Sequence, residues 1–114
     1  MADGLRNGII FFNSQRYFEA HEAWEDMWRE ERGELRLFYQ GLVQAAVGLH
    51  HLSRGNQLGA RSQLTKSLSK LDQYPNHTAG IDVEQFRQDL RGLLDRTETK
   101  SYPIIRGGVP SDEN

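Results

Sequence analysis

The stretch Glu34–Ser53, ELRLFYQGLVQAAVGLHHLS, is the most hydrophobic part of the chain. Its large apolar residues recur at the spacing of an α-helix, among them Phe38, Leu42 and Leu49. The opposite side is also small or apolar. A helix that is apolar nearly all round is normally enclosed by other helices. We therefore predict a central helix over residues 34–53 and a helical protein around it.

Helical spacing continues on both sides of this segment. The breaks between helices are marked by Asn13-Ser14, by Gly33, by Arg54-Gly55-Asn56 and by Tyr74-Pro75. They predict a short first helix over about Leu5–Phe12 with Asp3 as its N-cap, a second over about Gln15–Arg32, a fourth over about Gln57–Gln73, and a fifth opened by Asp82 and Gln85 as a capping box. Arg54-Gly55-Asn56 is also expected to cap the helix that follows it.

Prolines and glycines argue against another helix after Thr99, although Tyr102–Ile105 is apolar enough to fold back on the bundle. The predicted fold class is all-α: a compact bundle of about five helices arranged as helical hairpins. We expect a single domain over residues 1–100 and an irregular C-terminal tail over residues 101–114.

A possible internal repeat appears when the chain is shifted by forty residues, which aligns Phe18 with Leu58, Ala20 with Ala60 and Trp24 with Leu64. Repeated helical hairpins of this length are typical of solenoid families. Two copies do not establish a repeat, because any two amphipathic helices can be slid into register.

Composition narrows the function classes. The 114 residues carry a net charge of -2 and no cysteine, which removes disulfides, thiolate metal sites and Cys nucleophiles. Basic and acidic residues are interleaved, so we expect no nucleic-acid binding. The short apolar stretch near the N-terminus does not resemble a signal peptide, and no run is long enough to cross a membrane. We expect a cytoplasmic protein without a membrane partner.

The candidate site lies in Tyr17–Trp28, YFEAHEAWEDMW. His21 and Glu25 are four residues apart on a predicted helix, so their side chains can meet, with Glu22 beyond them. An imidazole and a carboxylate at this spacing can bind a divalent ion or act as an oriented base. The zinc-protease pattern His-Glu-x-x-His fails, because Glu25 stands where the second histidine is required.

Polar residues also interrupt the central helix. Gln40 and Gln44 are one turn apart, with His51 on nearly the same face. Buried amides are costly unless paired, so we expect them to bond to the His21, Glu22 and Glu25 group or to a ligand. His50 points another way, beside Val43, and is expected to be a core or edge histidine.

Each of these groups also has a purely structural interpretation. The pair of His21 and Glu25 is typical of a satisfied structural contact between helices. The two glutamines are typical of a hydrogen-bond network that fixes helix register. Trp24 and Trp28 lie on the inward face as core residues or, alternatively, as the walls of a pocket.

The string from Phe12 through Tyr17-Phe18-Glu19-Ala20-His21-Glu22, Trp24-Glu25 and Trp28, followed by Phe38–Ala46, resembles domain-of-unknown-function family 309. These are small helical proteins of bacteria and archaea. The resemblance covers about Ile10 to Leu71 and implies a helical bundle in which the His-Glu motif faces the glutamine-bearing helix. It implies no activity. The positions that match the family pattern are His21, Glu22, Glu25, Trp28, Gln40 and Gln44.

Two hypotheses follow. The first is a binding or scaffolding module that holds a small ligand or a protein segment in a Trp-lined groove, with the six matching residues as its site. The second is a small metal-assisted hydrolase that uses His21, Glu22 and Glu25. The first is favoured, because the chain has no phosphate-binding loop and no Glu-x-x-His pair of the kind that a di-iron bundle requires on two helices. We expect no cofactor. A homo-oligomer fits the many Trp and Leu residues that five short helices must cover.

Overall fold

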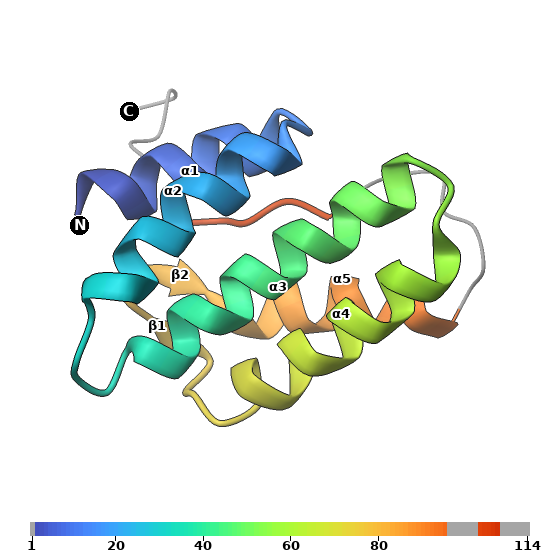
Figure 1. Ribbon diagram of the computed structural model, residues 1–114. Helices are drawn as coiled ribbons and strands as arrows, with labels where there is room; N and C mark the ends of the chain where they lie inside the picture. Colours follow the sequence, from blue (N-terminus) through green and yellow to red (C-terminus); the bar gives the residue numbers. More distant parts are fainter. Residues whose placement is uncertain (1, 96–102, 108–114) are drawn as a thin grey trace, which may run out of the picture.

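The fold is helical, as predicted. A computed structural model describes residues 2–95 and 103–107. In these residues the chain forms five α-helices and a two-stranded antiparallel ribbon (Figure 1). The elements are α1 (Asp3–Asn13), α2 (Tyr17–Glu30), α3 (Arg36–Ser53), α4 (Gln57–Leu71), β1 (His77–Thr78), β2 (Ile81–Asp82) and α5 (Val83–Asp95).

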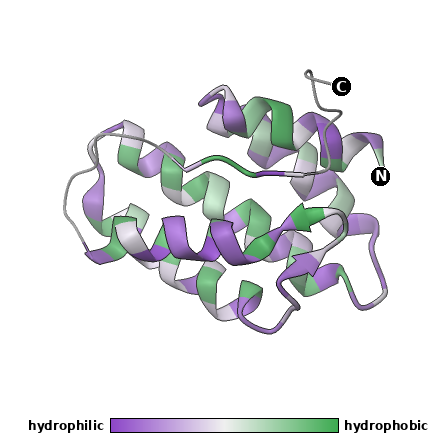
Figure 2. Ribbon diagram, turned by 180° about the vertical axis from the view of Figure 1, so that it is seen from behind, coloured by the Kyte–Doolittle hydropathy of each residue, from purple (hydrophilic) through white to green (hydrophobic). Residues whose placement is uncertain are grey.

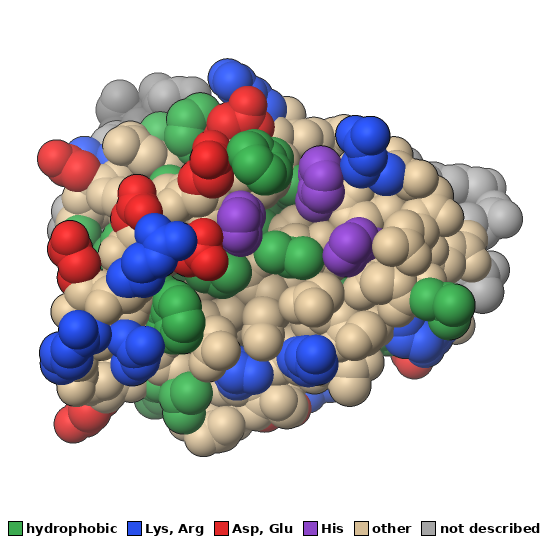
Figure 3. Space-filling view, in the orientation of Figure 1, with side chains coloured by type: hydrophobic (Ala, Val, Ile, Leu, Met, Phe, Trp, Pro, Cys, Tyr) green, Lys and Arg blue, Asp and Glu red, His purple; other side chains and the backbone are tan. Residues whose placement is uncertain are grey.

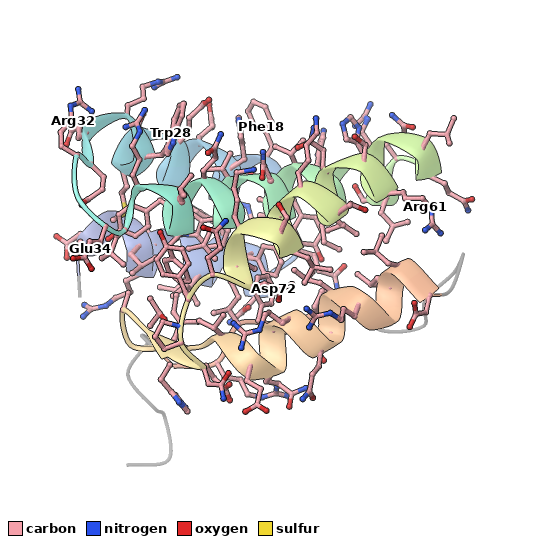
Figure 4. The ribbon with its side chains drawn as sticks, turned by 90° about the horizontal axis from the view of Figure 1, so that it is seen from below. Phe18, Trp28, Arg32, Glu34, Arg61 and Asp72 are labelled. Atoms are coloured by element: carbon pink, nitrogen blue, oxygen red, sulfur yellow. The ribbon has the colours of Figure 1, made fainter. Side chains whose placement is uncertain are left out.

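The helices α2, α3 and α4 lie side by side in one layer, with α3 in the middle and α5 behind it (Figures 1 and 4). The central position predicted for the most hydrophobic helix is confirmed, since α3 contacts both α2 and α4. Aromatic rings fill the space beneath the layer: the Phe12 ring lies 5.7 Å from that of Trp24 and 5.5 Å from that of Phe86. These three residues and Phe38 are the largest side chains that are fully buried.

The turns between helices repeat at an interval of forty residues. After α1, the backbone N–H groups of Gln15 and Arg16 donate to Phe12 and Phe11; after α3, those of Gly55 and Asn56 donate to Leu52 and His51 in the same pattern. Gln15 and Gly55 both have a left-handed backbone, with φ of 62° and 80°. The pairs α1–α2 and α3–α4 are therefore two copies of one helical hairpin.

The contacts inside each hairpin repeat as well. A Cβ on Gly8 would lie 2.1 Å from Trp24 Nε1, and a Cβ on Gly48 would lie 2.8 Å from Leu64 Cγ. Both glycines let a large side chain of the second helix reach the backbone of the first. Gly8 and Gly48, like Trp24 and Leu64, are forty residues apart. The forty-residue alignment that the sequence alone did not establish therefore pairs residues that make equivalent contacts in the two hairpins.

The helix ends depart from the predictions where the backbone turns early. The second helix was expected from Gln15, but it begins at Tyr17 because Gln15 occupies the left-handed turn. Asp3 is not an N-cap: Ala2 holds that position without a side-chain bond, and Asp3 lies in the first turn.

The caps of the last two helices were predicted more successfully. Asn56 accepts a hydrogen bond from the N–H of Gly59, and Asp82 accepts one from the N–H of Gln85. The reciprocal half of the predicted capping box is absent among the described residues, since the Gln85 side chain donates to Asp89 and the N–H of Asp82 donates to Arg106.

Residues 103–107 fold back on the bundle, as expected from their apolar character. Seen from behind, this segment crosses the molecule next to β2 and α1 (Figure 2). Ile105 is only 2% exposed. The Asn13 amide donates to the carbonyl of Ile105 at 2.9 Å and accepts from its N–H at 2.8 Å. The other residues of the predicted tail, 101–102 and 108–114, lie outside the described residues.

The described helices include none that combines the length and the apolar character needed to cross a membrane.

Candidate functional site

A hollow of about 210 Å³ opens on the face formed by α2 and α3. It is lined by Phe18 and His21 from α2 and by Val47 and His50 from α3. The Phe18 ring lies 5.7 Å from the His21 ring and 6.0 Å from the His50 ring, and it is 52% exposed. Figure 3 shows histidine side chains gathered around hydrophobic ones on this face, with carboxylates to one side.

The geometry of the α2–α3 hairpin brings these four residues together. In an antiparallel hairpin, residues equally distant from the turn lie at the same level. Phe18 and His50 both stand sixteen residues from Glu34, and His21 and Val47 both stand thirteen residues from it. Helical spacing within α2 and α3 does not reveal this, and His50 was expected to be a core or edge histidine unrelated to His21. Pairing residues across the Gly33 break would have identified both His50 and Phe18.

His21 and Glu25 meet as their spacing predicts. His21 Nε2 lies 3.4 Å from Glu25 Oε1, and the same oxygen lies 3.2 Å from the guanidinium of Arg29. Arg29 also pairs with Asp26 at 3.1 Å. The His21 and Glu25 side chains are both half-buried, so Glu25 is held at the edge of the hollow between an imidazole and a cation.

Two further carboxylates lie on α2 near the hollow. Glu22 follows Phe18 by one helical turn and is exposed, and among the described residues it forms no ion pair. Glu19 pairs with Arg16 at 3.1 Å. A backbone N–H at the start of the helix and the Arg16 side chain hold the pKa of the Glu19 carboxyl below its ordinary value. Glu22 is therefore the carboxylate left available beside Phe18.

The predicted bonds between the glutamines and the His21 group do not form. Within residues 2–95 and 103–107, no hydrogen bond joins Gln40 or Gln44 to His21, Glu22 or Glu25, and the buried Oε1 of Gln44 has no partner. His51, which was placed with the glutamines, instead contacts Asn56, at 3.2 Å between Nδ1 and Nδ2. Both glutamines are half-buried on α3, and neither lines the hollow.

A groove walled by both tryptophans is also not what the structure contains. Trp24 is fully buried, and its Nε1 donates to the carbonyl of Leu5 at 3.2 Å. Trp28 is half-buried beneath the Arg36 guanidinium, which lies 4.5 Å from the ring centroid and donates to the Trp28 carbonyl at 2.6 Å. Trp24 is thus a core residue, and Trp28 is the site at which Arg36 contacts the C-terminal end of α2.

The cluster offers few ligands for a metal ion. In the part of the chain that the structure describes, no three His, Cys, Asp or Glu side chains are arranged to hold one. A zinc site would need three protein ligands around one point. Among the described residues, His21, Glu22 and Glu25 therefore do not form a three-ligand zinc site.

Comparison with known proteins gives a family and two curated relatives. A protein of Aquifex aeolicus (strain VF5), described as uncharacterised, is 26% identical over 113 residues, which are 98% of this chain and 34% of that protein. YpuF of Bacillus subtilis (strain 168), also described as uncharacterised, is 30% identical over 98 residues, or 82% of this chain and 55% of that protein. The chain thus spans about a third of the first relative and about half of the second.

The family model for a domain of unknown function, DUF309, matches residues 5–63, which contain most of α1 and all of α2 and α3 and so include all four residues that line the hollow. The family resemblance inferred from the His-Glu motif is confirmed, and the chain belongs to the DUF309 family.

Proposed function

We propose that this domain is a binding module that receives a hydrophobic side chain of a partner polypeptide in the hollow between α2 and α3. The observation that carries the proposal is the exposed ring of Phe18 beside a hollow of about 210 Å³. Leaving a large aromatic side chain in water forgoes about 1.5–3 kcal/mol of burial. A docked side chain would recover part of that free energy.

The charges next to the hollow favour a partner with basic residues. Glu22 follows Phe18 by one turn and Glu25 follows His21 by one turn. Arg29 already neutralises Glu25, which leaves Glu22 to attract a cation. The partner would therefore present an aromatic or branched side chain with a Lys or Arg about one helical turn away, as in helix-in-groove recognition.

The proposal is tested by selecting binders from a displayed library of random peptides on the purified domain. We expect enrichment of a hydrophobic anchor followed by a basic residue. For a selected peptide, Phe18→Ser should weaken binding by about tenfold or more, because burial of an aromatic ring is lost. Glu22→Gln should weaken it by about two- to fivefold, as an exposed ion pair does.

Ile10→Ser is the matched control, because Ile10 is 46% exposed on α1 and lies outside the hollow. It should leave the affinity unchanged, and circular dichroism should show both serine variants folded. A library without enriched sequences, or equal losses for Phe18→Ser and Ile10→Ser, would overturn the proposal.

A further inference from the structure

The second hairpin carries its own version of the hollow. Leu58 and Arg61 stand on α4 where Phe18 and His21 stand on α2, forty residues earlier. Leu58 is 84% exposed and Phe18 is 52% exposed. In each copy, the second residue of the second helix is therefore a large apolar side chain in contact with water.

A hollow of about 140 Å³ lies beside Leu58, where α4 meets the ends of α3 and α5. The apolar walls come from all three helices, and two polar residues stand among them, Arg61 and Gln57. The apolar residues are Leu52, Leu58, Ala60, Leu64, Leu93 and Leu94. In Figure 4, Phe18 projects outward from α2, whereas Arg61 extends from α4 toward α5. The two hollows thus share two equivalent lining positions, Phe18 with Leu58 and His21 with Arg61, while their other lining residues are not forty residues apart.

Arg61 differs from His21 in its charge and in its partners. One terminal guanidinium nitrogen donates to the carbonyl of Leu94 at 3.0 Å. Across the described residues, Arg61 is paired with no carboxylate. A guanidinium presents five donors and prefers a carboxylate as acceptor. The hollow therefore combines largely aliphatic walls with the Arg61 guanidinium, which can still donate hydrogen bonds to an anionic ligand.

We propose that this second hollow docks a polypeptide segment in which a leucine-like side chain stands next to a carboxylate. The aliphatic side chain enters between Leu58 and Leu93, and the carboxylate bonds to Arg61. A volume of about 140 Å³ suits one aliphatic side chain. This acidic segment is opposite in charge to the basic segment proposed for the first hollow.

The test uses two blocked tripeptides, acetyl-Gly-Leu-Glu-amide and acetyl-Gly-Leu-Gln-amide, which differ in one carboxylate. Each is titrated into the protein with ¹³C-labelled leucine methyl groups. We expect saturable shifts at Leu58, Leu93 and Leu94, and an affinity about two- to fivefold higher for the Glu peptide. Arg61→Gln should abolish that difference. Arg54→Gln, which changes an exposed arginine outside the hollow, should preserve it.

Any of three results would overturn the inference: equal affinity for the two peptides, a preference that survives Arg61→Gln, or saturable shifts only at leucine methyl groups outside this hollow. Nuclear Overhauser contacts in the free protein from Leu58 or Leu93 to residues beyond Asp95 would also overturn it, because the chain itself would then occupy the hollow. Phe18→Ser should leave tripeptide binding unchanged, so failure at one hollow does not decide the other.

Discussion

At the scale of single residues, Gly8 decides how closely α1 and α2 approach. The Trp24 indole lies against the Gly8 backbone and donates its N–H to the carbonyl of Leu5. This buried donor is satisfied only while the ring stays there. The largest buried side chain of the protein therefore depends on the smallest residue of the facing helix.

We expect Gly8→Ala to destabilise the protein, although alanine is the better helix former. The new Cβ would lie 2.1 Å from Trp24 Nε1, and overpacking of this kind costs about 1–3 kcal/mol. The helix gains about 0.5–1 kcal/mol. Urea unfolding should show a lower free energy of unfolding for Gly8→Ala, whereas Asn7→Ala, on the exposed side of α1, should be neutral or stabilising. A stability of Gly8→Ala equal to that of Asn7→Ala would contradict this account.

How far residue contacts could be predicted depended on their distance along the chain. The contact of His21 with Glu25 follows from the helical repeat alone. To predict the contact of Phe18 with His50, one must know how the two helices are aligned. To predict that Gln44 Oε1 has no hydrogen-bond partner, one must know which polar groups the neighbouring helices place near it. Local periodicity contains neither kind of information.

At the scale of elements, the connection between the two helices of each hairpin has a fixed shape. Arg16 and Asn56 begin α2 and α4 with similar dihedral angles, φ −97° and ψ 74° against φ −90° and ψ 84°. The residue before each is left-handed, and it is Gln15 in one copy and Gly55 in the other. Glutamine is strained in that region whereas glycine is not.

This difference predicts opposite responses to exchanging the two residues. Gly55→Gln should lower the free energy of unfolding by about 1–2 kcal/mol, and the cause is the backbone alone, because nothing lies within 4 Å of a Cβ at this position. Gln15→Gly should leave stability unchanged or raise it, since relief of strain offsets the added freedom of the unfolded chain. Thermal melts of both variants provide the check, and a comparable loss in both would mean that the turns are not equivalent.

The helices themselves were predictable because their apolar residues recur at helical spacing, and α3 is apolar nearly all round. Their ends were less so. Asn56 was identified as a cap because its side chain forms a local bond to the N–H of Gly59. The start of α2 was misplaced because glutamine rarely takes the left-handed conformation seen at Gln15, and nothing in its local sequence announces it.

At the scale of the whole molecule, residues 103–107 join the two ends of the described chain. Ile105 is held by the Asn13 amide, Arg106 accepts a bond from the N–H of Asp82, and Gly107 pairs with Ile81. Apolar character alone predicted that this segment would fold back. The site at which it docks was not predictable, because Asn13 is 92 residues away.

We expect Ile105→Ala to destabilise the whole domain and not only its tail. Ile105 is 2% exposed within the core, and such truncations cost about 2–5 kcal/mol. Ile104→Ala is the matched control, since Ile104 is 41% exposed. Urea unfolding should show one cooperative transition at a lower midpoint for Ile105→Ala and almost no change for Ile104→Ala. Faster hydrogen exchange limited to Asp82, with the midpoint unchanged, would show that the segment is not part of the core.

The docking of Ile105 also bears on how the protein is made. A ribosome completes both hairpins, whose contacts are local, well before residue 105 is synthesised. Until then the nascent chain exposes the apolar surface beside Asn13 and β2 that Ile105 later covers. Such exposed surface attracts chaperones and favours aggregation. Translation that stops before residue 103 would therefore release a nearly complete helical bundle that is still a substrate for quality control.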